Sequence, residues 1–438
     1  MRFPGDHGPG STRIMSINTG DQALHIPYME EETMTQDFQP VAGGITAPRG
    51  FLAAGIHAGL KKEKLDLALI VSEVPATAAA VYTRNRVKAA PLRVTAEHLK
   101  AGLARAIVAN SGYANACTGE RGYRDAREMA VVTAGAVGCE PWQVVVASTG
   151  VIGVPLPMDK VTAGIQAAAA RLAVEGGRDA AAAIMTTDTR IKEIAIQLPL
   201  GGETVTIAGI AKGSGMIHPN MGTMLCFLTT DAAIEQEDLE QALRVVVDRT
   251  FNMVTVDGDT STNDMAVILA NGCAGNAPLT IEEHAAFRSG LEYVCRYLAR
   301  LIARDGEGAS KLITVEVYGA ASEVEARQVA RSVAGSNLVK SAIFGADANW
   351  GRIICAAGYS GAEIDPDKID IYLESHAGRE QMAAGGEPLP FSEAKAAAIL
   401  AEEEITIILD LNRGRAAATA WGCDLTYDYV KINASYRT

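Results

Sequence analysis

Residues 212–231 read KGSGMIHPNMGTMLCFLTTD, a glycine-containing loop that runs into an apolar segment. The run from Met224 to Thr230 predicts a buried strand. Thr223 precedes this strand and follows Gly222, whose missing Cβ leaves the preceding carbonyl open to attack by the threonine hydroxyl. That attack would cut the chain before Thr223, and the new α-amine would be the base for the same residue's hydroxyl. From these residues alone, a strand-initiating threonine is the alternative, because Thr has a high β propensity.

Seven other segments accompany this one in a fixed order along the chain. They read GGITAPRGF (43–51), ANSGYANACTG (109–119), STGVIG (148–153), TTDT (186–189), DGEGAS (305–310), NWGR (349–352) and YVKINASYRT (429–438). Together with residues 212–231, they resemble the ornithine acetyltransferase family (glutamate N-acetyltransferase) of arginine biosynthesis. The resemblance covers residues 41–438 and implies a layered αββα-type fold, similar to an N-terminal-nucleophile hydrolase with different connectivity.

The resemblance also implies a set of site residues. Thr223 would be the nucleophile, the cut would fall between Gly222 and Thr223, and Thr149 with Gly150 would form the oxyanion hole. Without the resemblance, Thr149-Gly150 is a small-residue turn after a strand. The residues implied to contact substrate are Thr189, Lys212, Thr223, Glu307, Asn433 and the C-terminal Thr438. By charge, Lys212 suits a carboxylate, Glu307 an ammonium group, and Asn433 either end of an amino acid.

Other polar residues in these segments are expected to have lesser roles. Asp188, Asn115, Asn349 and Arg352 are interpreted as structural. His218 precedes Thr223 by five residues, but the α-amine makes a histidine base redundant. Asp257 and Asp259 lack further ligands at suitable spacing, so no metal is expected. The glycines of residues 212–215 lack the order of a phosphate-binding P-loop. The sequence therefore predicts no cofactor.

Composition limits the class of protein. The 438 residues include 39 Lys and Arg against 52 Asp and Glu, a net charge of −13, which argues against nucleic-acid binding. Seven scattered cysteines without a Cys-x-x-Cys pair are typical of a reduced, cytoplasmic protein. No uncharged run of about 20 apolar residues predicts a membrane span. Residues 1–40 lack an apolar core pattern and predict a disordered extension or a misplaced start, with Met34 as the alternative start.

Apolar periodicity predicts mixed α/β (α+β) structure, without the regular βαβ rhythm of a dinucleotide-binding fold. A hairpin is expected around Gly201-Gly202, with strands at residues 191–198 and 204–210. Residues 67–83 are interpreted as strand, turn and strand. Further strands are predicted at 104–110, 144–147, 265–270, 312–317, 369–373 and 405–411, and helices at 125–137, 158–172, 178–185, 236–249, 281–303, 323–334 and 393–402.

These features lead to one functional hypothesis and two alternatives. The chain would cut itself into an α chain ending at residue 222 and a β chain of residues 223–438, and move the acetyl group of N²-acetylornithine to glutamate through acetyl-Thr223. The sequence leaves acetyl-CoA open as a second acetyl donor. The resemblance implies an assembly of two α and two β chains. The alternatives are an N-terminal-threonine amidohydrolase or aminopeptidase with water as acceptor, and an uncleaved binding protein.

Overall fold

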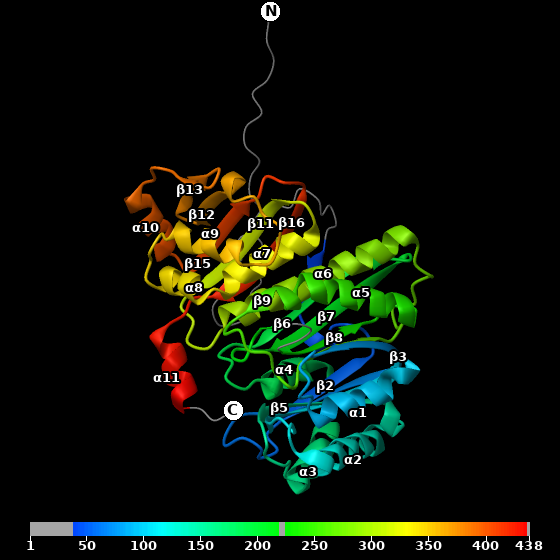
Figure 1. Ribbon diagram of the computed structural model, residues 1–438. Coiled ribbons are helices and arrows are strands. Elements are labelled where there is room, and N and C mark those ends of the chain that lie inside the picture. The colour runs from blue at the N-terminus through cyan, green and yellow to red at the C-terminus, as the bar shows by residue number, and fades with distance from the viewer. Residues whose placement is uncertain (1–37, 219–223, 436–438) are drawn as a thin grey trace, which may run out of the picture.

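The computed structural model describes residues 38–218 and 224–435, which form two β-sheets with helices around them (Figure 1). Gly222, Thr223, Thr438 and nearly all of the predicted N-terminal extension lie outside the described residues. The helices are α1 (Ala90–His98), α2 (Gly119–Val137), α3 (Met158–Ala169), α4 (Gly177–Ile184), α5 (Gln236–Arg249), α6 (Ile281–Arg304), α7 (Glu323–Gly335), α8 (Asn337–Phe344), α9 (Trp350–Gly358), α10 (Glu393–Ala401) and α11 (Tyr427–Ser435).

The larger sheet has nine strands in the order β1-β6-β7-β8-β10-β3-β4-β5, with β2 paired to β3. They are β1 (Gln39–Pro40), β2 (Phe51–Ile56), β3 (Leu67–Tyr82), β4 (Leu103–Tyr113), β5 (Val144–Val151), β6 (Lys192–Leu200), β7 (Glu203–Lys212), β8 (Leu225–Thr230) and β10 (Met265–Ala270). β8 runs antiparallel to β7 and parallel to β10. β8 and β10, which follow residue 223, thus lie between β7 and β3, which precede residue 219.

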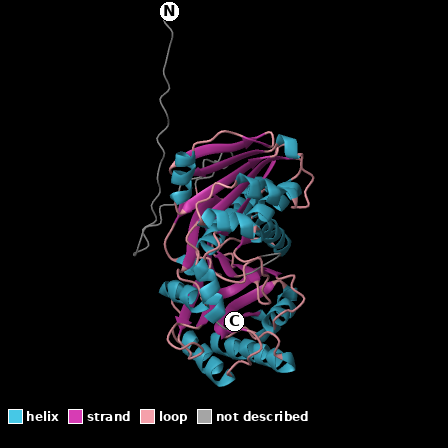
Figure 2. Ribbon diagram, turned by 60° about the vertical axis from the view of Figure 1, so that its left-hand side comes forward, coloured by secondary structure: helices cyan, strands magenta, loops and turns pink. Residues whose placement is uncertain are grey.

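Two strand layers lie between two helix layers, as Figure 2 shows for the lower part of the molecule. Successive strand residues point to opposite faces. Ile107 of β4 and Phe227 of β8 share an inner core, which α4 also joins. Their neighbours point outward, Val108 toward α2 and α3, and Leu228 toward α5 and α6. This is the αββα arrangement, so the predicted fold class is confirmed.

The smaller sheet has seven strands in the order β14-β13-β12-β15-β11-β16-β9, all from residues after 223. They are β9 (Val254–Thr255), β11 (Leu312–Ala320), β12 (Asp370–Ser375), β13 (Gly378–Ala384), β14 (Glu387–Pro388), β15 (Glu404–Asp410) and β16 (Ala416–Cys423). α6 packs against β6 and β7 of the larger sheet and also against β11 and β16, so it joins the two sheets. Beside them, α11 leads the chain down toward the larger sheet (Figure 1).

Most predicted elements are present, with some differences. α5 and β10 have the predicted bounds, and the hairpin around Gly201-Gly202 is β6–β7. The turn expected within residues 67–83 is wrong, because β3 runs on as one 16-residue strand. Its pairing with β4 shifts register between Val71 and Ala76, and this irregularity accommodates Pro75. α1, α8, α9 and α11 have no counterpart among the predicted helices.

Candidate active site

One cavity of about 220 Å³ brings together five of the predicted site residues. Thr149 and Gly150 reach it from β5, Lys212 from the end of β7, Glu307 from the loop after α6, and Asn433 from α11. Met216 and Met224, on either side of residues 219–223, line it too. The remaining lining residues are Ile152, Thr186, Thr187, Gly215, Leu225, Asp257, Asp259, Ser261, Thr262, Asn263, Asp264 and Tyr429.

The turn at Thr149-Gly150 is shaped by backbone constraints. Gly150 has a φ of +130°, which L side chains rarely adopt, and a Cβ there would lie 2.3 Å from the carbonyl carbon of Gly112 on β4. Both the backbone angle and this close contact therefore require glycine at position 150. Asn263 braces the turn, because its Nδ2 donates to the carbonyl oxygens of Ser148 (2.8 Å) and Ala114 (2.6 Å). A hydroxyl and a backbone turn are thus held rigidly at the cavity wall, as an oxyanion site needs.

Lys212 is largely buried, with 7% of its surface exposed. It pairs with Leu225 across β7 and β8, and Leu225 pairs in turn with Met265 of β10. Its ammonium group therefore enters the cavity from a fixed strand end, beside the strand that follows residue 223. A cation largely removed from water is a strong partner for a ligand carboxylate.

Glu307 is the second charged residue that the sequence analysis placed in the site. It is 6% exposed, and its Oε2 accepts a hydrogen bond from Nδ2 of Asn433 at 2.8 Å. This bond connects the loop after α6 to α11. Gly215 makes the close approach possible, since a Cβ on it would lie 2.3 Å from the Glu307 carboxylate. The pair offers a carboxylate and an amide to the cavity from two remote segments.

The segment before residues 219–223 is anchored by side chains that sequence reasoning missed. Asp257 accepts hydrogen bonds from the backbone N–H groups of Met216 (2.6 Å) and Ile217 (2.8 Å). The Thr260 hydroxyl donates to the carbonyl of His218 at 2.8 Å. Asp257, considered from sequence only as a metal ligand, instead fixes the backbone that leads into the predicted cut site. No sequence spacing signals this role, because backbone N–H groups carry no side-chain identity.

His218 faces away from the cavity. Its Nδ1 lies 3.0 Å from the Thr255 hydroxyl and its Nε2 lies 3.1 Å from the Arg331 guanidinium. Burial, and then the charge of Arg331, lower the pKa of His218. The residue lines another cavity, with Arg331 and Asp248. This placement fits the expectation that His218 is not the base.

Thr189 lies beside the cavity without lining it. Its hydroxyl donates to Oδ1 of Asp305 and its backbone N–H to Oδ2 of the same residue at 3.1 Å. Thr189 lines an adjoining cavity with Arg190 and Asp428. Its predicted contact with substrate therefore remains a prediction.

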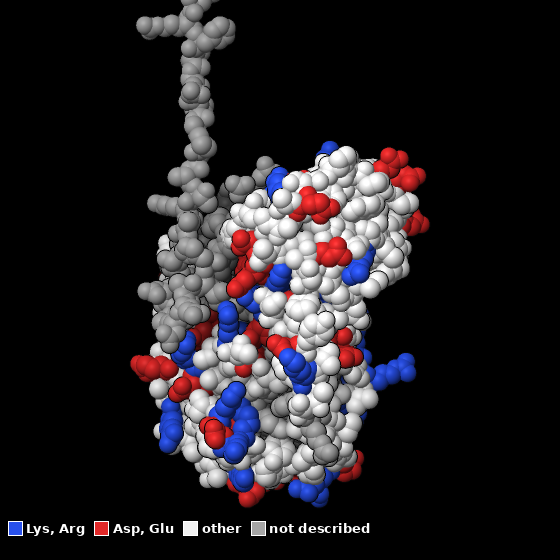
Figure 3. Space-filling view, turned by 90° about the vertical axis from the view of Figure 1, so that its left-hand side faces the viewer, with Lys and Arg blue, Asp and Glu red and all other residues white. Residues whose placement is uncertain are grey.

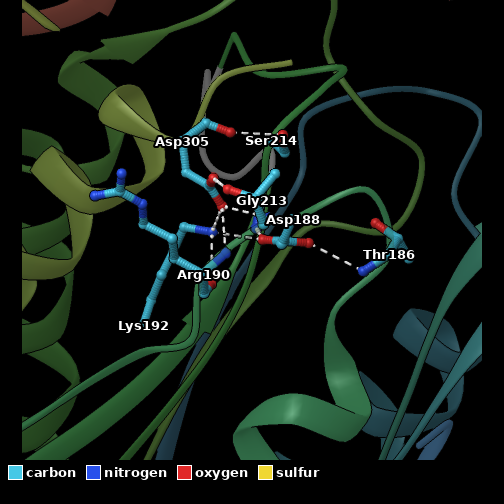
Figure 4. A network of polar contacts seen from close by, with 8 residues as sticks. Thr186, Asp188, Arg190, Lys192, Gly213, Ser214 and Asp305 are labelled. Carbon is cyan, nitrogen blue, oxygen red and sulfur yellow. Dashed lines mark hydrogen bonds and ion pairs between the residues drawn. The ribbon is translucent and has the colours of Figure 1, made fainter. Parts of the chain in front are cut away.

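Asp305 also belongs to a buried ion network (Figure 4). Nζ of Lys192 donates to Asp188 at 2.7 Å and to Asp305 at 2.6 Å. Asp188 further accepts from the backbone N–H of Gly213 at 2.7 Å. Burial opposes the charged form of Asp188, but Lys192 and Lys212 outweigh it and hold the pKa of that carboxyl below its usual range. Asp188 thus has the structural role interpreted from the sequence, and it connects the cavity wall to the loop after α6.

Three other residues also have structural contacts. Asn349 caps α9 by accepting from the backbone N–H of Arg352 at 3.3 Å, and Arg352 donates to the carbonyl of Leu338. Asn115 has a φ of 48° and donates to the carbonyl of Gly122 at 2.8 Å. All three contacts fix local backbone.

The described part of the chain holds no group of three or more His, Cys, Asp or Glu residues that could bind a metal ion. None of its helices is long and apolar enough to span a membrane. On the face shown in Figure 3, Lys and Arg side chains are interspersed with Asp and Glu side chains.

Comparison with known proteins places these residues in a family. The chain matches the ArgJ family over residues 52–438. The arginine biosynthesis bifunctional protein ArgJ of Symbiobacterium thermophilum is 59% identical over 403 residues, 91% of this chain and 99% of that protein. The protein of the same description from Bacillus subtilis is 51% identical over 402 residues, 91% and 97% of the two chains. A solved chain of Bacillus halodurans ArgJ, 52% identical, covers 48% of this chain and 97% of its own length, with a TM-score of 0.45. The protein belongs to the ArgJ family.

Proposed function

We propose that this protein is a self-processing acetyltransferase of arginine biosynthesis, which transfers the acetyl group of N²-acetylornithine to glutamate. The observation that carries the proposal is the single cavity lined by Thr149, Gly150, Lys212, Glu307 and Asn433. The relatives of this protein that are named bifunctional proteins of arginine biosynthesis match nearly the whole chain. This match supports the same reaction class.

The proposed cut falls between Gly222 and Thr223. Met216 and Met224 line the cavity from the two sides of this position, and Asp257 holds the incoming backbone. The products would be an α chain ending at residue 222 and a β chain of residues 223–438. Pairing of β8 with β7 and of β10 with β3 would keep the chains together, and so would the ion pair of Lys192 with Asp305.

In the transfer, the α-amine of Thr223 takes the hydroxyl proton and Thr223 Oγ attacks the acetyl carbonyl. Thr149 and Gly150 stabilise the oxyanion, and removing one such donor typically costs 10²- to 10³-fold in rate. Lys212 binds the substrate carboxylate, and Glu307 with Asn433 binds the ammonium end. Ornithine leaves, and glutamate accepts the acetyl group from Thr223. Neither a metal nor a cofactor is needed for these steps.

The test uses purified full-length protein and its Thr223→Ala and Thr223→Ser variants. The wild type should yield two chains and form N-acetylglutamate from N²-acetylornithine and glutamate. Thr223→Ala should lose both the cut and the transfer, whereas Thr223→Ser keeps a hydroxyl and should retain part of each. Transfer by the Thr223→Ala variant would refute the scheme.

The same assay separates the remaining possibilities. Acetate release without any need for glutamate would identify an amidohydrolase, and one intact, inactive chain would identify a binding protein. Replacing N²-acetylornithine by acetyl-CoA tests the second donor. A cytoplasmic location remains a prediction from the cysteine pattern, and an assembly of two α and two β chains a prediction from the resemblance. Sedimentation of the processed protein tests the assembly.

A further inference from the structure

Asp264 lines the cavity but has no role in the scheme above. It directly precedes β10, and only 2% of its surface is exposed. Its Oδ2 has no hydrogen-bond partner in the described part of the chain, although buried carboxylate oxygens are normally paired. No ion pair is recorded for this carboxyl group within residues 38–218 and 224–435. Asp264 thus combines a place in the cavity wall with a carboxyl oxygen that no described group of the protein satisfies.

The surroundings of Asp264 favour the neutral acid. Burial raises the pKa of this carboxyl well above its usual range, and hydrogen bonding by Ser261 and the charge of Lys212 offset this only in part. Lys212 approaches from β7, while Asp257 and Asp259 lie on the loop of Asp264 itself. The other charged cavity residue is Glu307, and the partly buried Tyr82 of β3 pairs with Met265. Burial therefore favours the protonated carboxyl group, which can donate a proton.

Strand register places Asp264 near the start of β8, the strand that follows the proposed acyl carrier Thr223. Lys212, Leu225 and Met265 lie side by side on β7, β8 and β10. The backbone N–H of Met265 donates to the carbonyl of Met224 at 3.0 Å, so Asp264 lies beside the residue that follows Thr223. In an N²-acyl amino acid, the amide nitrogen sits on the carbon next to the carboxylate. A donor whose carboxylate is held by Lys212 therefore presents its amide nitrogen near Asp264.

We propose that Asp264 is a further acid–base residue of this cavity, which gives its proton to the amine that leaves the acyl group and takes a proton from the amine that accepts it. This inference rests on the proposed function. It assigns the protonation of the leaving amine, and the deprotonation of the accepting amine, to Asp264 instead of the Thr223 amine. In the first half-reaction, the C–N bond breaks, the departing nitrogen gains the Asp264 proton, and the Thr223 amine keeps the hydroxyl proton. In the second, the incoming amino group first gives one proton to solvent and attacks the acetyl carbonyl as the free amine. As the C–N bond forms and the ester C–O bond breaks, the Asp264 carboxylate takes a proton from that nitrogen, and Thr223 Oγ regains its own from the Thr223 ammonium.

The test compares two acetyl donors in the first half-reaction alone. N²-Acetylornithine must have its leaving nitrogen protonated, whereas the phenolate of 4-nitrophenyl acetate leaves without a proton. Acetylation of the cut protein is followed without glutamate, by rapid quench and intact mass. Asp264→Asn should slow acetylation by the amide donor roughly 10²- to 10⁴-fold, the usual range for a general acid. Acetylation by the ester should change by less than about tenfold, because it needs no acid.

A matched control comes from α2. Asp125 is also a buried aspartate whose Oδ2 has no hydrogen-bond partner and whose pKa is raised by burial, but it forms an ion pair with Arg121 at 3.7 Å and does not line the cavity. Asp125→Asn should acetylate with both donors as the wild type does. Equal losses toward both donors in Asp264→Asn would overturn the inference and leave the proposed function standing. A wild type that forms no acetyl-enzyme with either donor would instead refute the proposed function.

If Asp264→Asn is not cut or does not fold, the wild type itself provides the test. Amide-donor acetylation should fall as pH rises through the pKa of Asp264, since the acid form is required, and ester acetylation should not fall with it. Asp264→Glu, which keeps an acid group, should retain the preference of the wild type between the donors. Identical pH profiles for the two donors would overturn the inference.

Discussion

Replacing Lys192 by methionine removes the cation that joins Asp188 to Asp305. All three side chains are buried, with exposed fractions of 1% for Lys192, 0% for Asp188 and 4% for Asp305. Methionine fills a similar volume but leaves two carboxylates without their cation. The substitution therefore tests whether this network stabilises the contact between segments on either side of the proposed cut.

The expected loss is large for one side chain. Removing one partner of a buried ion pair typically costs about 3–5 kcal/mol. Asp188 would keep its bonds from the backbone N–H groups of Gly213 (2.7 Å) and Thr186 (3.0 Å), so the lower end of this range applies. A loss of about 3 kcal/mol raises the unfolded-to-folded ratio roughly 100-fold.

Unfolding in urea measures this loss. The Thr223→Ala background should give a single chain, so that unfolding and chain separation are not mixed. Lys368 forms an exposed ion pair with Asp365 and provides the control; Lys368→Met should leave the unfolding midpoint unchanged. The double variant Lys192→Met/Asp305→Asn should lose less than the sum of its single variants, because it removes one of the unpaired charges.

The pH dependence of the loss follows from the two pKa shifts. Asp188 has a lowered pKa in the folded state, so its contribution is complete above the unfolded value of about 4 and disappears as pH falls toward the folded value. For Lys192, Asp188 and Asp305 outweigh burial and raise the pKa. Its contribution is complete below the unfolded value of about 10.4 and is lost as pH rises through the folded value. A loss below about 1 kcal/mol at neutral pH, or strict additivity in the double variant, would refute the reasoning.

Three further changes have defined outcomes. In Gly150→Ala the new Cβ would lie 2.3 Å from the Gly112 backbone, and acetyl transfer should fall by at least about 10²-fold. Transfer is measured as N-acetylglutamate formation, with the unfolding midpoint as control; unchanged transfer would mean that Gly150 is not part of the oxyanion site. Asp257→Ala frees the N–H groups of Met216 and Ile217 and should slow the appearance of two chains in an intact-mass time course, and equal rates would contradict its anchoring role. Thr280→Ala removes the side-chain cap of α6, which accepts from Glu283 N–H at 3.2 Å, and should cost about 1 kcal/mol in urea unfolding; no change would mean that the cap is replaced by solvent.

Local sequence signals predicted the elements whose pattern is complete within a few residues. The β6–β7 hairpin has two glycines between β-prone runs, and α5 combines helical periodicity with an acidic first turn. The turn predicted within β3 is wrong because Pro75 is typical of a turn. In the structure Pro75 lies inside the strand, where the pairing of β3 with β4 shifts register. That accommodation depends on the neighbouring strand, which local sequence does not reveal.

The site residues also differ in whether the sequence alone could identify them. Thr149, Lys212, Glu307 and Asn433 lie far apart in the chain, and only the family resemblance brought them together before the fold was known. Asn263 and Asp264 had no motif to mark them. Asn263 donates to the carbonyl groups of Ser148 on β5 and of Ala114 just after β4. Asp264 stands out only because it is buried with one carboxyl oxygen unpartnered. Such roles arise from tertiary packing.

Intact mass and N-terminal sequencing of the purified, denatured protein test the central claim most directly. The account predicts two chains, with one beginning at Thr223, and a Thr223→Ala variant that stays whole. A wild type that remains a single chain of 438 residues and still transfers acetyl groups would contradict it, because an uncut Thr223 has no free amine to act as base.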